Sequence, residues 1–96
     1  MFILHFKNKF LKKEKKLTKN NHILKKAVDE TIGLLEINPK NPALKSHKIK
    51  DINGDFAFSS TITGDIRLIW NYQEGRAHIL DILDIGGHEG KNKVYK

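Results

Sequence analysis

The sequence contains no cysteine, and it has only two prolines, one methionine and one tryptophan. Without cysteine the chain can form neither a disulfide bond nor a thiolate metal site, which suits a reducing compartment. The scarcity of proline and the 39% of apolar residues exclude a disordered or collagen-like chain and are typical of a globular protein. A chain of 96 residues is long enough for one modest hydrophobic core. We therefore expect a single domain over residues 1–96.

A long hydrophobic run is also missing. Residues 1–16 place their apolar side chains ahead of the charged ones, and they contain no apolar stretch as long as that of a signal peptide. A membrane-spanning helix would need about 20 consecutive apolar residues. We therefore expect a cytoplasmic protein that does not interact with a membrane.

Positive charge is concentrated in the first half of the chain. Residues 1–50 hold 13 lysines and four acidic residues, whereas residues 51–96 hold five lysines and arginines and seven acidic residues. The two halves carry formal charges of +9 and −2, which together give the +7 of the whole chain. A cationic surface binds nucleic acid, a ribosome, an anionic membrane or an acidic protein, because each association releases counterions or pairs charges.

The first half of the chain predicts one short strand followed by a helical hairpin. Residues 1–6 are apolar and suit a strand at the centre or the edge of a sheet. Over residues 7–19 apolar side chains recur at roughly helical spacing among lysines, which predicts an amphipathic helix with a narrow core face. The polar residues 18–21 can cap a second helix that begins near His22. That helix must end at Asn38-Pro39, because a residue before proline avoids the helical conformation.

The second half predicts a loop and then three strands joined by tight turns. Residues 40–54 combine turn-forming and charged residues, which is typical of a connecting loop. Alternating side chains predict a hairpin of strands over residues 56–62 and 66–72, and the aliphatic run 77–85 predicts a central strand. The expected fold is α+β, in the order β-α-α-β-β-β. A two-helix hairpin packs on one face of a mainly antiparallel sheet of about four strands, and the other face is free.

Three motifs in the second half are similar to those of a known family. The residues L-K-S-H-K-I-K at 44–50 are similar to the family pattern L-x-x-H-K-L-K, and D-I-R-L-I-W at 65–70 is similar to D-Y-R-L-I-Y. D-I-G-G-H at 84–88 is similar to D-I-G-T-H, and Val94-Tyr95 also matches. With these motifs and its order of elements, the chain resembles the RelE/ParE toxin superfamily, and within it the RelE/StbE and YafQ-like branch of mRNA interferases. The resemblance covers nearly the whole chain.

The resemblance implies a function and a set of partners. The protein would be the toxin of a type II toxin–antitoxin system, acting as a metal-independent, ribosome-dependent mRNA endoribonuclease that inhibits translation. Its partners would be an acidic antitoxin, the ribosome with its mRNA, and operator DNA only through the antitoxin. A basic sheet with one free face can accept an acidic segment that folds on binding. No cofactor is expected.

Two of the places where the chain departs from the family pattern concern the expected site. Residues 89–93 form an insertion between the last motif and the closing Val94-Tyr95. The strand before the arginine carries Phe58, Ser59 and Ser60 where RelE-type members have basic residues. The second departure favours a histidine-based mechanism, as in YafQ-like members, over a lysine-based one.

Cleavage of RNA through its own 2′-hydroxyl needs a base, a cation beside the phosphate and an acid for the leaving 5′-oxygen. Histidine suits both proton-transfer roles because it exchanges protons near neutral pH, and His47 and His88 are the candidates. Arg67 is the candidate phosphate clamp, since a guanidinium keeps its charge and forms paired hydrogen bonds. We expect Asp65 to orient a histidine or the arginine, and Tyr95 to stack on a base or donate a proton.

Lysines are the candidates for holding the RNA backbone. Lys48 and Lys50 lie within three residues of His47 in the sequence and would hold the RNA backbone. The predicted first helix offers a second group for docking on ribosomal RNA. This group consists of Lys12, Lys13 and Lys16.

Each of these residues also has a plainer interpretation. His47 and His88 are compatible with a surface loop and a glycine-rich turn that have no catalytic role. The lysines of the first helix are compatible with a solvated helix face. Arg67 is compatible with a structural ion pair. The acidic residues that would form that pair are Asp55, Asp65 and Asp84.

Two other functions are compatible with the same fold. One is a ParE-like inhibitor of DNA gyrase that performs no chemistry of its own. The other is an inactive member that only binds its antitoxin. The histidine pair favours cleavage over gyrase inhibition, and the inactive member stays an open alternative. A metal site is not expected, because the histidines and acidic residues near the end of the chain match no established ligand spacing.

Overall fold

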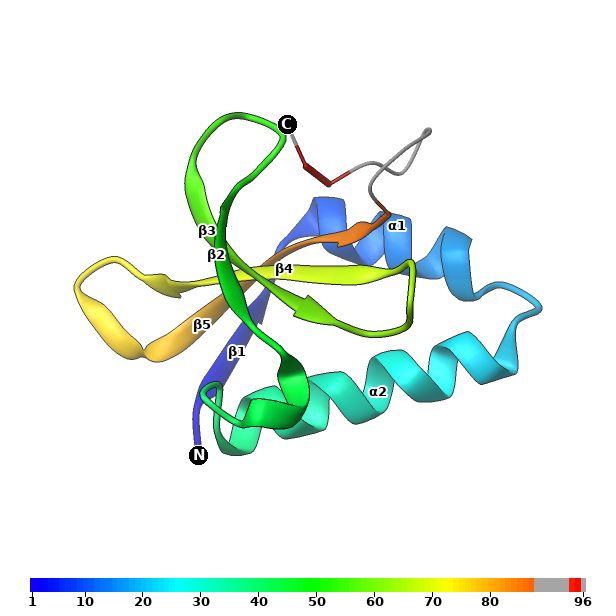
Figure 1. Cartoon of the computed structure of the whole chain (residues 1–96), viewed down its shortest axis with the longest axis horizontal. Coiled ribbons are helices and arrows are strands. Elements are labelled where there is room, and N and C mark those ends of the chain that lie inside the picture. The colour runs from blue at the N-terminus through cyan, green and yellow to red at the C-terminus, as the bar shows by residue number, and fades with distance from the viewer. Residues whose placement is uncertain (88–93, 96) are drawn as a thin grey trace.

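The computed structural model describes residues 1–87, 94 and 95, and it has two helices packed on one face of a five-stranded sheet. Figure 1 shows both helices on the same side of the sheet. This is the α+β class that the sequence predicts. In chain order the elements are β1 (Ile3–Phe6), α1 (Asn8–Thr18), α2 (His22–Ile37), the short 3₁₀ helix η1 (Pro42–Leu44), β2 (His47–Lys50), β3 (Phe56–Thr61), β4 (Arg67–Gln73) and β5 (Arg76–Gly86).

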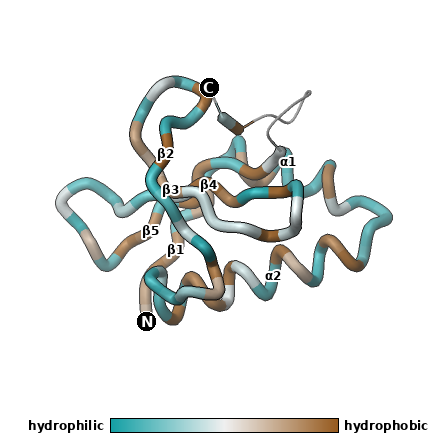
Figure 2. Tube along the Cα trace, in the orientation of Figure 1, coloured by the Kyte–Doolittle hydropathy of each residue, from teal (hydrophilic) through white to brown (hydrophobic). Residues whose placement is uncertain are grey.

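The second helix has the caps and the apolar stripe that its sequence predicts. The side chain of Asn21 accepts a hydrogen bond of 3.0 Å from the amide of Leu24, so one of the unpaired amides at the helix start is satisfied. The helix ends at Asn38, just before proline. Its stripe is visible as alternating brown and teal along α2 in Figure 2. The buried members of the stripe are Leu24, Val28, Thr31 and Leu35.

The first helix is held by a narrower apolar face. Phe10 is its one buried residue, and the neighbouring Leu11 is 45% exposed. The sequence, in which lysines separate the few apolar residues of α1, predicts this narrow face. No helix in the described part of the chain is long and apolar enough to cross a membrane.

The strand order in the sheet is β1-β5-β4-β3-β2. β1 pairs in parallel with β5, and every other pair is antiparallel. β5 therefore lies inside the sheet, as its aliphatic sequence predicts, and β1 takes an edge. A register shift between Ile69 and Trp70 leaves Leu83 as an extra residue on β5.

The prediction of a loop over residues 40–54 is wrong at residues 47–50, which form the strand β2. This additional strand gives the sheet five strands, where about four are predicted. β2 is an edge strand that pairs only with β3, and three of its four residues are exposed. Ile49 is the only apolar residue in it. Charged side chains such as lysine protect an exposed strand edge from aggregation, and they also remove the apolar alternation by which a strand is recognised.

The two faces of the sheet have separate apolar clusters. On the helix-covered face the cluster includes Leu68, Trp70 and Ile82 together with residues of both helices. On the opposite face, here called the open face, it has three buried members, Ala57, Ile69 and Val94. Burying a side chain of this size contributes about 1.5–3 kcal/mol, so most of the stability comes from the helix-covered face.

Candidate functional site

Strand pairing brings most of the predicted catalytic residues to the open face. His47 is directly opposite Ser59, and Ser59 is opposite Ile69, which belongs to the open-face cluster. Arg67 is two residues before Ile69 on β4, so it points to the same side. Residues that are diagonal neighbours across two strands lie about 7–8 Å apart. His47, Ser59 and Arg67 thus occupy adjoining positions on three neighbouring strands.

His47 is the first residue of β2, and its side chain is exposed. Its Nδ1 lies 3.5 Å from the carbonyl oxygen of Lys45, whose φ of 49° turns the chain from η1 into the strand. The next residue back, Ser46, is hydrogen-bonded to the buried Ser60 with 2.6 Å between their Oγ atoms. The start of β2 is therefore anchored, while the imidazole itself faces solvent.

The end of the chain returns to the open face beside Ser59. Val94 is fully buried in the open-face cluster, and its amide donates a 3.0 Å hydrogen bond to the carbonyl of Gly87. Tyr95 forms a β-bridge with Asp51, and its hydroxyl lies 2.5 Å from Ser59 Oγ. In Figure 1 these residues lie next to the loop between β2 and β3. The Tyr95 hydroxyl and His47 are thus both neighbours of Ser59.

Arg67 starts β4 opposite Thr61 and Gly86, and it is half-buried. Its Nη1 donates to the carbonyl oxygen of Thr63 at 2.6 Å and more weakly to that of Ile66 at 3.4 Å. It forms no ion pair with any acidic residue within the described ranges, so the pairing considered with Asp55, Asp65 or Asp84 is not found. Both bonds use Nη1, and a guanidinium has five N–H donors in all.

Asp65 lies against the end of β5 and not against the arginine. A Cβ built on Gly87 would be only 3.3 Å from Asp65 Oδ1, which shows how close this carboxylate is to the β5 backbone. Asp65 therefore sits beside the residue that precedes His88. His88 itself lies outside the described residues, as does the insertion at 89–93.

The lysines expected to hold RNA do not share one surface. Lys48 is opposite Phe58 and Lys50 is opposite Phe56, so both point away from the open face that His47 occupies. On α1, Lys12 and Lys16 are exposed. Lys13 is half-buried, and its Nζ lies 2.8 Å from a carboxylate oxygen of Asp84.

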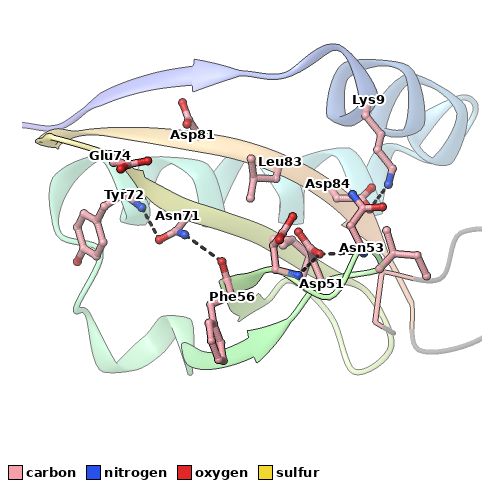
Figure 3. A pocket seen from close by; sticks show the side chains of 13 residues that line it. Lys9, Asp51, Asn53, Phe56, Asn71, Tyr72, Glu74, Asp81, Leu83 and Asp84 are labelled. Atoms are coloured by element: carbon pink, nitrogen blue, oxygen red, sulfur yellow. Dashed lines mark hydrogen bonds and ion pairs between the residues drawn. The ribbon is translucent and has the colours of Figure 1, made fainter.

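A cavity of about 400 Å³ opens on the same face, toward the loop between β2 and β3. Figure 3 shows Asp51, Asp81 and Asp84 around this hollow, with Lys9 reaching Asp84 from α1. The full set of acidic residues that line it is Asp51, Asp55, Glu74, Asp81 and Asp84. These carboxylates would repel a phosphate, so the side with Arg67 and His47 is the part of the open face that suits an anionic ligand.

Comparison with known proteins relies on solved structures, because no protein-family model and no curated protein matches the chain. The fold is similar to that of a metal-bound toxin from Helicobacter pylori, with 26% identity, a TM-score of 0.72 and coverage of 92% of this chain and 96% of that one. It is also similar to YafQ from Escherichia coli strain BL21(DE3), with 18% identity, a TM-score of 0.68 and coverage of 91% and 93%. A YoeB/ParE toxin from Agrobacterium tumefaciens has 14% identity, a TM-score of 0.74 and coverage of 92% and 100%.

The chain has the fold of these toxins, which is the fold that the resemblance to the RelE/ParE superfamily implies. The resemblance found in the sequence motifs is confirmed, and the likeness to YafQ is one of fold. YafQ is also known in complex with its antitoxin DinJ, and in that complex it has 19% identity and a TM-score of 0.67 to this chain. The members of the superfamily that the comparison finds are toxins.

Two features of this site are not predicted by the sequence. The first feature is Ser59. In the sequence it stands out only because RelE-type members have basic residues on this strand, but in the structure it is fully buried between His47 and the Tyr95 hydroxyl. Its alternation with the buried Ser60 could have indicated that two adjacent serines serve opposite faces. The acidic hollow gathers residues from three segments, and no local pattern identifies it.

Proposed function

We propose that this protein is the toxin of a type II toxin–antitoxin system and that it is a metal-independent, ribosome-dependent mRNA endoribonuclease. The observation that supports this most directly is the grouping of His47, Arg67 and Tyr95 on one face of a RelE/ParE fold. The three residues come from β2, β4 and the end of the chain. Their shared neighbour, Ser59, is buried and rigidly placed in the sheet.

In the proposed reaction His47 removes the proton from a 2′-hydroxyl. The 2′-oxygen then attacks the adjacent phosphorus, the bond to the 5′-oxygen breaks, and the products are a 2′,3′-cyclic phosphate and a free 5′-hydroxyl. His88, next to Gly87 at the end of β5, supplies the proton for the leaving oxygen. The exposure of His47 suits this role, because its imidazole must reach an RNA held outside the sheet.

Arg67 stabilises the negative charge that builds up on the phosphate. Its Nη1 is fixed by the carbonyl oxygens of Thr63 and Ile66, which hold the guanidinium plane in one orientation. The donors of Nη2 and Nε make no hydrogen bond within the described chain, so they are free to contact two phosphate oxygens. A prepositioned donor of this kind stabilises a transition state without reorganising during the reaction.

The proposed partners follow from charge and from the fold relatives. An acidic antitoxin would bind and silence the basic protein, as DinJ binds YafQ in the solved toxin–antitoxin complex. The exposed lysines of α1, Lys12 and Lys16, would dock on ribosomal RNA. Operator DNA would be reached only through the antitoxin, and the cytoplasm is the compartment in which these partners meet.

The deciding experiment is to induce the chain alone in a bacterial host and to map the 5′ ends of cellular mRNA. Arg67→Ala and His47→Ala are the test variants. Arg76→Ala and His78→Ala are matched controls, because they remove the same side-chain types from exposed positions on β5. We expect in-frame cuts within translated regions that vanish in the test variants and persist in the controls. Growth arrest without new cuts would instead indicate another target, such as DNA gyrase.

One observation favours a second candidate, a member that binds its antitoxin but does not cleave RNA. Arg67 already donates to two carbonyl oxygens, and the neighbouring hollow is lined by carboxylates. Both features weaken the open face as a phosphate site. If induction causes neither growth arrest nor new 5′ ends, while the protein still copurifies with a co-encoded acidic protein, this second function holds.

A further inference from the structure

A surface on the side of the sheet away from His47 combines lysines with three aromatic rings, of which Phe56 is exposed and the other two are half-buried. The alternation along three neighbouring strands brings Lys48 and Lys50 of β2, Phe56 and Phe58 of β3 and Tyr72 of β4 to this side. We call these five residues the aromatic–lysine strip. All four residues Phe56, Tyr72, Asp81 and Leu83 line the acidic hollow, and Figure 3 shows the rings of Phe56 and Tyr72 pointing away from Asp81 and Leu83.

Phe56 is the most unusual residue in the strip. Phenylalanine is usually a buried residue type, but the side chain of Phe56 is 60% exposed. The Nζ of Lys48 lies 4.8 Å from the centre of its ring, and the Nζ of Lys50 lies 5.4 Å from it. An exposed phenylalanine stabilises the fold little, whereas a ring with cations beside it suits a planar, anionic ligand.

Next to Phe56 the strip leads into a pocket of about 500 Å³ with aromatic walls. Phe58 and Tyr72 line it, and both contact the ring of Trp70, at 4.9 Å and 5.4 Å between centroids. Pro39 and Pro42 form the opposite wall, at the η1 turn. Lysines 40 and 45 also line the pocket, so its rim is positively charged.

We propose that the aromatic–lysine strip binds single-stranded RNA, with one base stacked on Phe56 and a neighbouring base in the pocket beside Tyr72. Lys48 and Lys50 would pair with the phosphates between these bases. The inference rests on the proposed function, because it concerns the same RNA substrate. β2 is the edge strand, with His47 on one side and Lys48 on the other. An RNA strand crossing this edge can reach the catalytic face and the strip together.

The chemistry of the strip favours single-stranded RNA over an acidic protein segment. Lysines alone would be sufficient to bind carboxylates, but they leave the exposed Phe56 ring and the aromatic pocket without a role. Flat bases stack on such rings, and the phosphates of the same molecule pair with the lysines. A duplex is disfavoured because its bases are already stacked and are not available to the strip.

Trp70 provides a direct readout of the pocket. It is the only tryptophan in the chain, it is 1% exposed, and its ring contacts both Phe58 and Tyr72. We expect a single-stranded oligoadenylate of about ten nucleotides to change the Trp70 fluorescence in a saturable manner. An RNA hairpin without single-stranded ends should leave the fluorescence unchanged. The titration uses the purified protein and no ribosome, so it detects binding whether or not RNA is cleaved.

Matched variants distinguish stacking from general charge attraction. Phe56→Ala should weaken binding of the oligonucleotide about tenfold, since a stacked base is lost. Ile37→Ala, at a residue 68% exposed on α2, is its control and should leave binding unchanged. The double variant Lys48→Gln/Lys50→Gln should lower the slope of log K against log salt by about 1.4, which is about 0.7 for each phosphate contact. Lys19→Gln/Lys26→Gln removes the same charge from exposed positions and should not change the slope.

The outcomes separate this inference from the proposed function. RNA binding that depends on Phe56, in a protein that cleaves no mRNA, would overturn the endoribonuclease and leave the strip standing. Cleavage of mRNA with all strip variants equal to their controls would overturn the strip alone. Binding of polyglutamate as tight as that of the oligonucleotide, with the same loss in Lys48→Gln/Lys50→Gln, would reassign the surface to an acidic protein segment.

Discussion

The helix-covered face and the open face of the sheet bury their residues in different ways. On the helix-covered face, Leu68 and Trp70 are enclosed by residues from both helices and from three strands. On the open face, Ile69 is enclosed mainly by Ala57 and by Val94 from the end of the chain. Adjacent residues of one strand thus serve two purposes. The helix-covered face supplies most of the apolar packing, and the open face carries polar side chains around a small apolar cluster.

The largest expected effects compare two neighbouring residues of β4. Leu68 and Ile69 are both fully buried, on the helix-covered and the open face respectively. We expect Leu68→Ala to lower the free energy of unfolding by about 3–4 kcal/mol, because the surrounding core cannot collapse into the cavity. Ile69→Ala should cost about 2 kcal/mol, because the buried cluster around Ile69 is much smaller than the one around Leu68. Urea denaturation of both variants measures the difference, and equal costs would show that the two faces are equally rigid.

Two adjacent serines of β3 provide the same comparison for hydrogen bonds. Ser60 accepts a 2.8 Å bond from Trp70 Nε1 on the helix-covered face. Ser60→Ala would leave this indole N–H buried without a partner, and we expect a loss of about 2 kcal/mol. Ser59→Ala removes one partner of the hydroxyl of the half-buried Tyr95, and water can replace that partner, so the loss should be at most about 1 kcal/mol.

Growth arrest should show the reverse order for the same two serines. Ser59 lies between His47 and Tyr95, so Ser59→Ala should weaken arrest more than Ser60→Ala does at a temperature where both variants are folded. If arrest instead follows stability in both variants, Ser59 has no role beyond packing.

The sequence predicts the helix-covered face well because that face depends on local patterns. The apolar spacing of α2, the cap at Asn21 and the alternation along β3 and β4 are properties of short segments. Even so, β2 is missed, since a strand made of His47, two lysines and one isoleucine has no apolar alternation. Edge strands often carry charged side chains because these prevent pairing with another chain, and so the sequences of edge strands resemble those of loops.

The open face is harder to predict because it depends on register. The motifs identify His47 and Arg67 as candidates, but only the pairing of β2 with β3 shows that Lys48 and Lys50 face away from them. The acidic hollow is also a product of register, since Asp51, Asp81 and Glu74 come from different parts of the chain. Which residues share a face can be predicted only once the strand partners are known.

Asp84 connects the open face with α1, and its replacement should have a moderate effect. Its carboxylate is 6% exposed and lies 2.8 Å from Lys13 Nζ and 3.3 Å from Lys9 Nζ. Asp84→Asn keeps a hydrogen-bond acceptor but loses the charge, so we expect a loss of about 1 kcal/mol in unfolding free energy. The control is Asp55→Asn, an exposed acid that lines the same hollow and should cost almost nothing. Equal values would mean that Asp84 gains nothing from the helix lysines.

The smallest expected effect concerns the ion pairs on the helix surface, where solvent screens charge. Lys25 of α2 lies 3.1 Å from Glu14 of α1 and 3.2 Å from Asp29, and its side chain is 47% exposed. The hydrogen bond that Lys25 Nζ donates to Glu14 Oε2 raises the pKa of Lys25 above its ordinary value. A raised pKa means that the folded state favours the protonated amine, so the stabilisation is complete at neutral pH and is lost as the pH rises through the folded-state pKa. We therefore expect Lys25→Gln to cost no more than about 0.5 kcal/mol at pH 7 and still less in strongly alkaline buffer. The measurement is the thermal unfolding temperature of Lys25→Gln and of the unchanged protein at increasing pH. If the difference between the two grew with pH, the expected pH dependence would be wrong, and Lys25 would be buried more deeply between the helices.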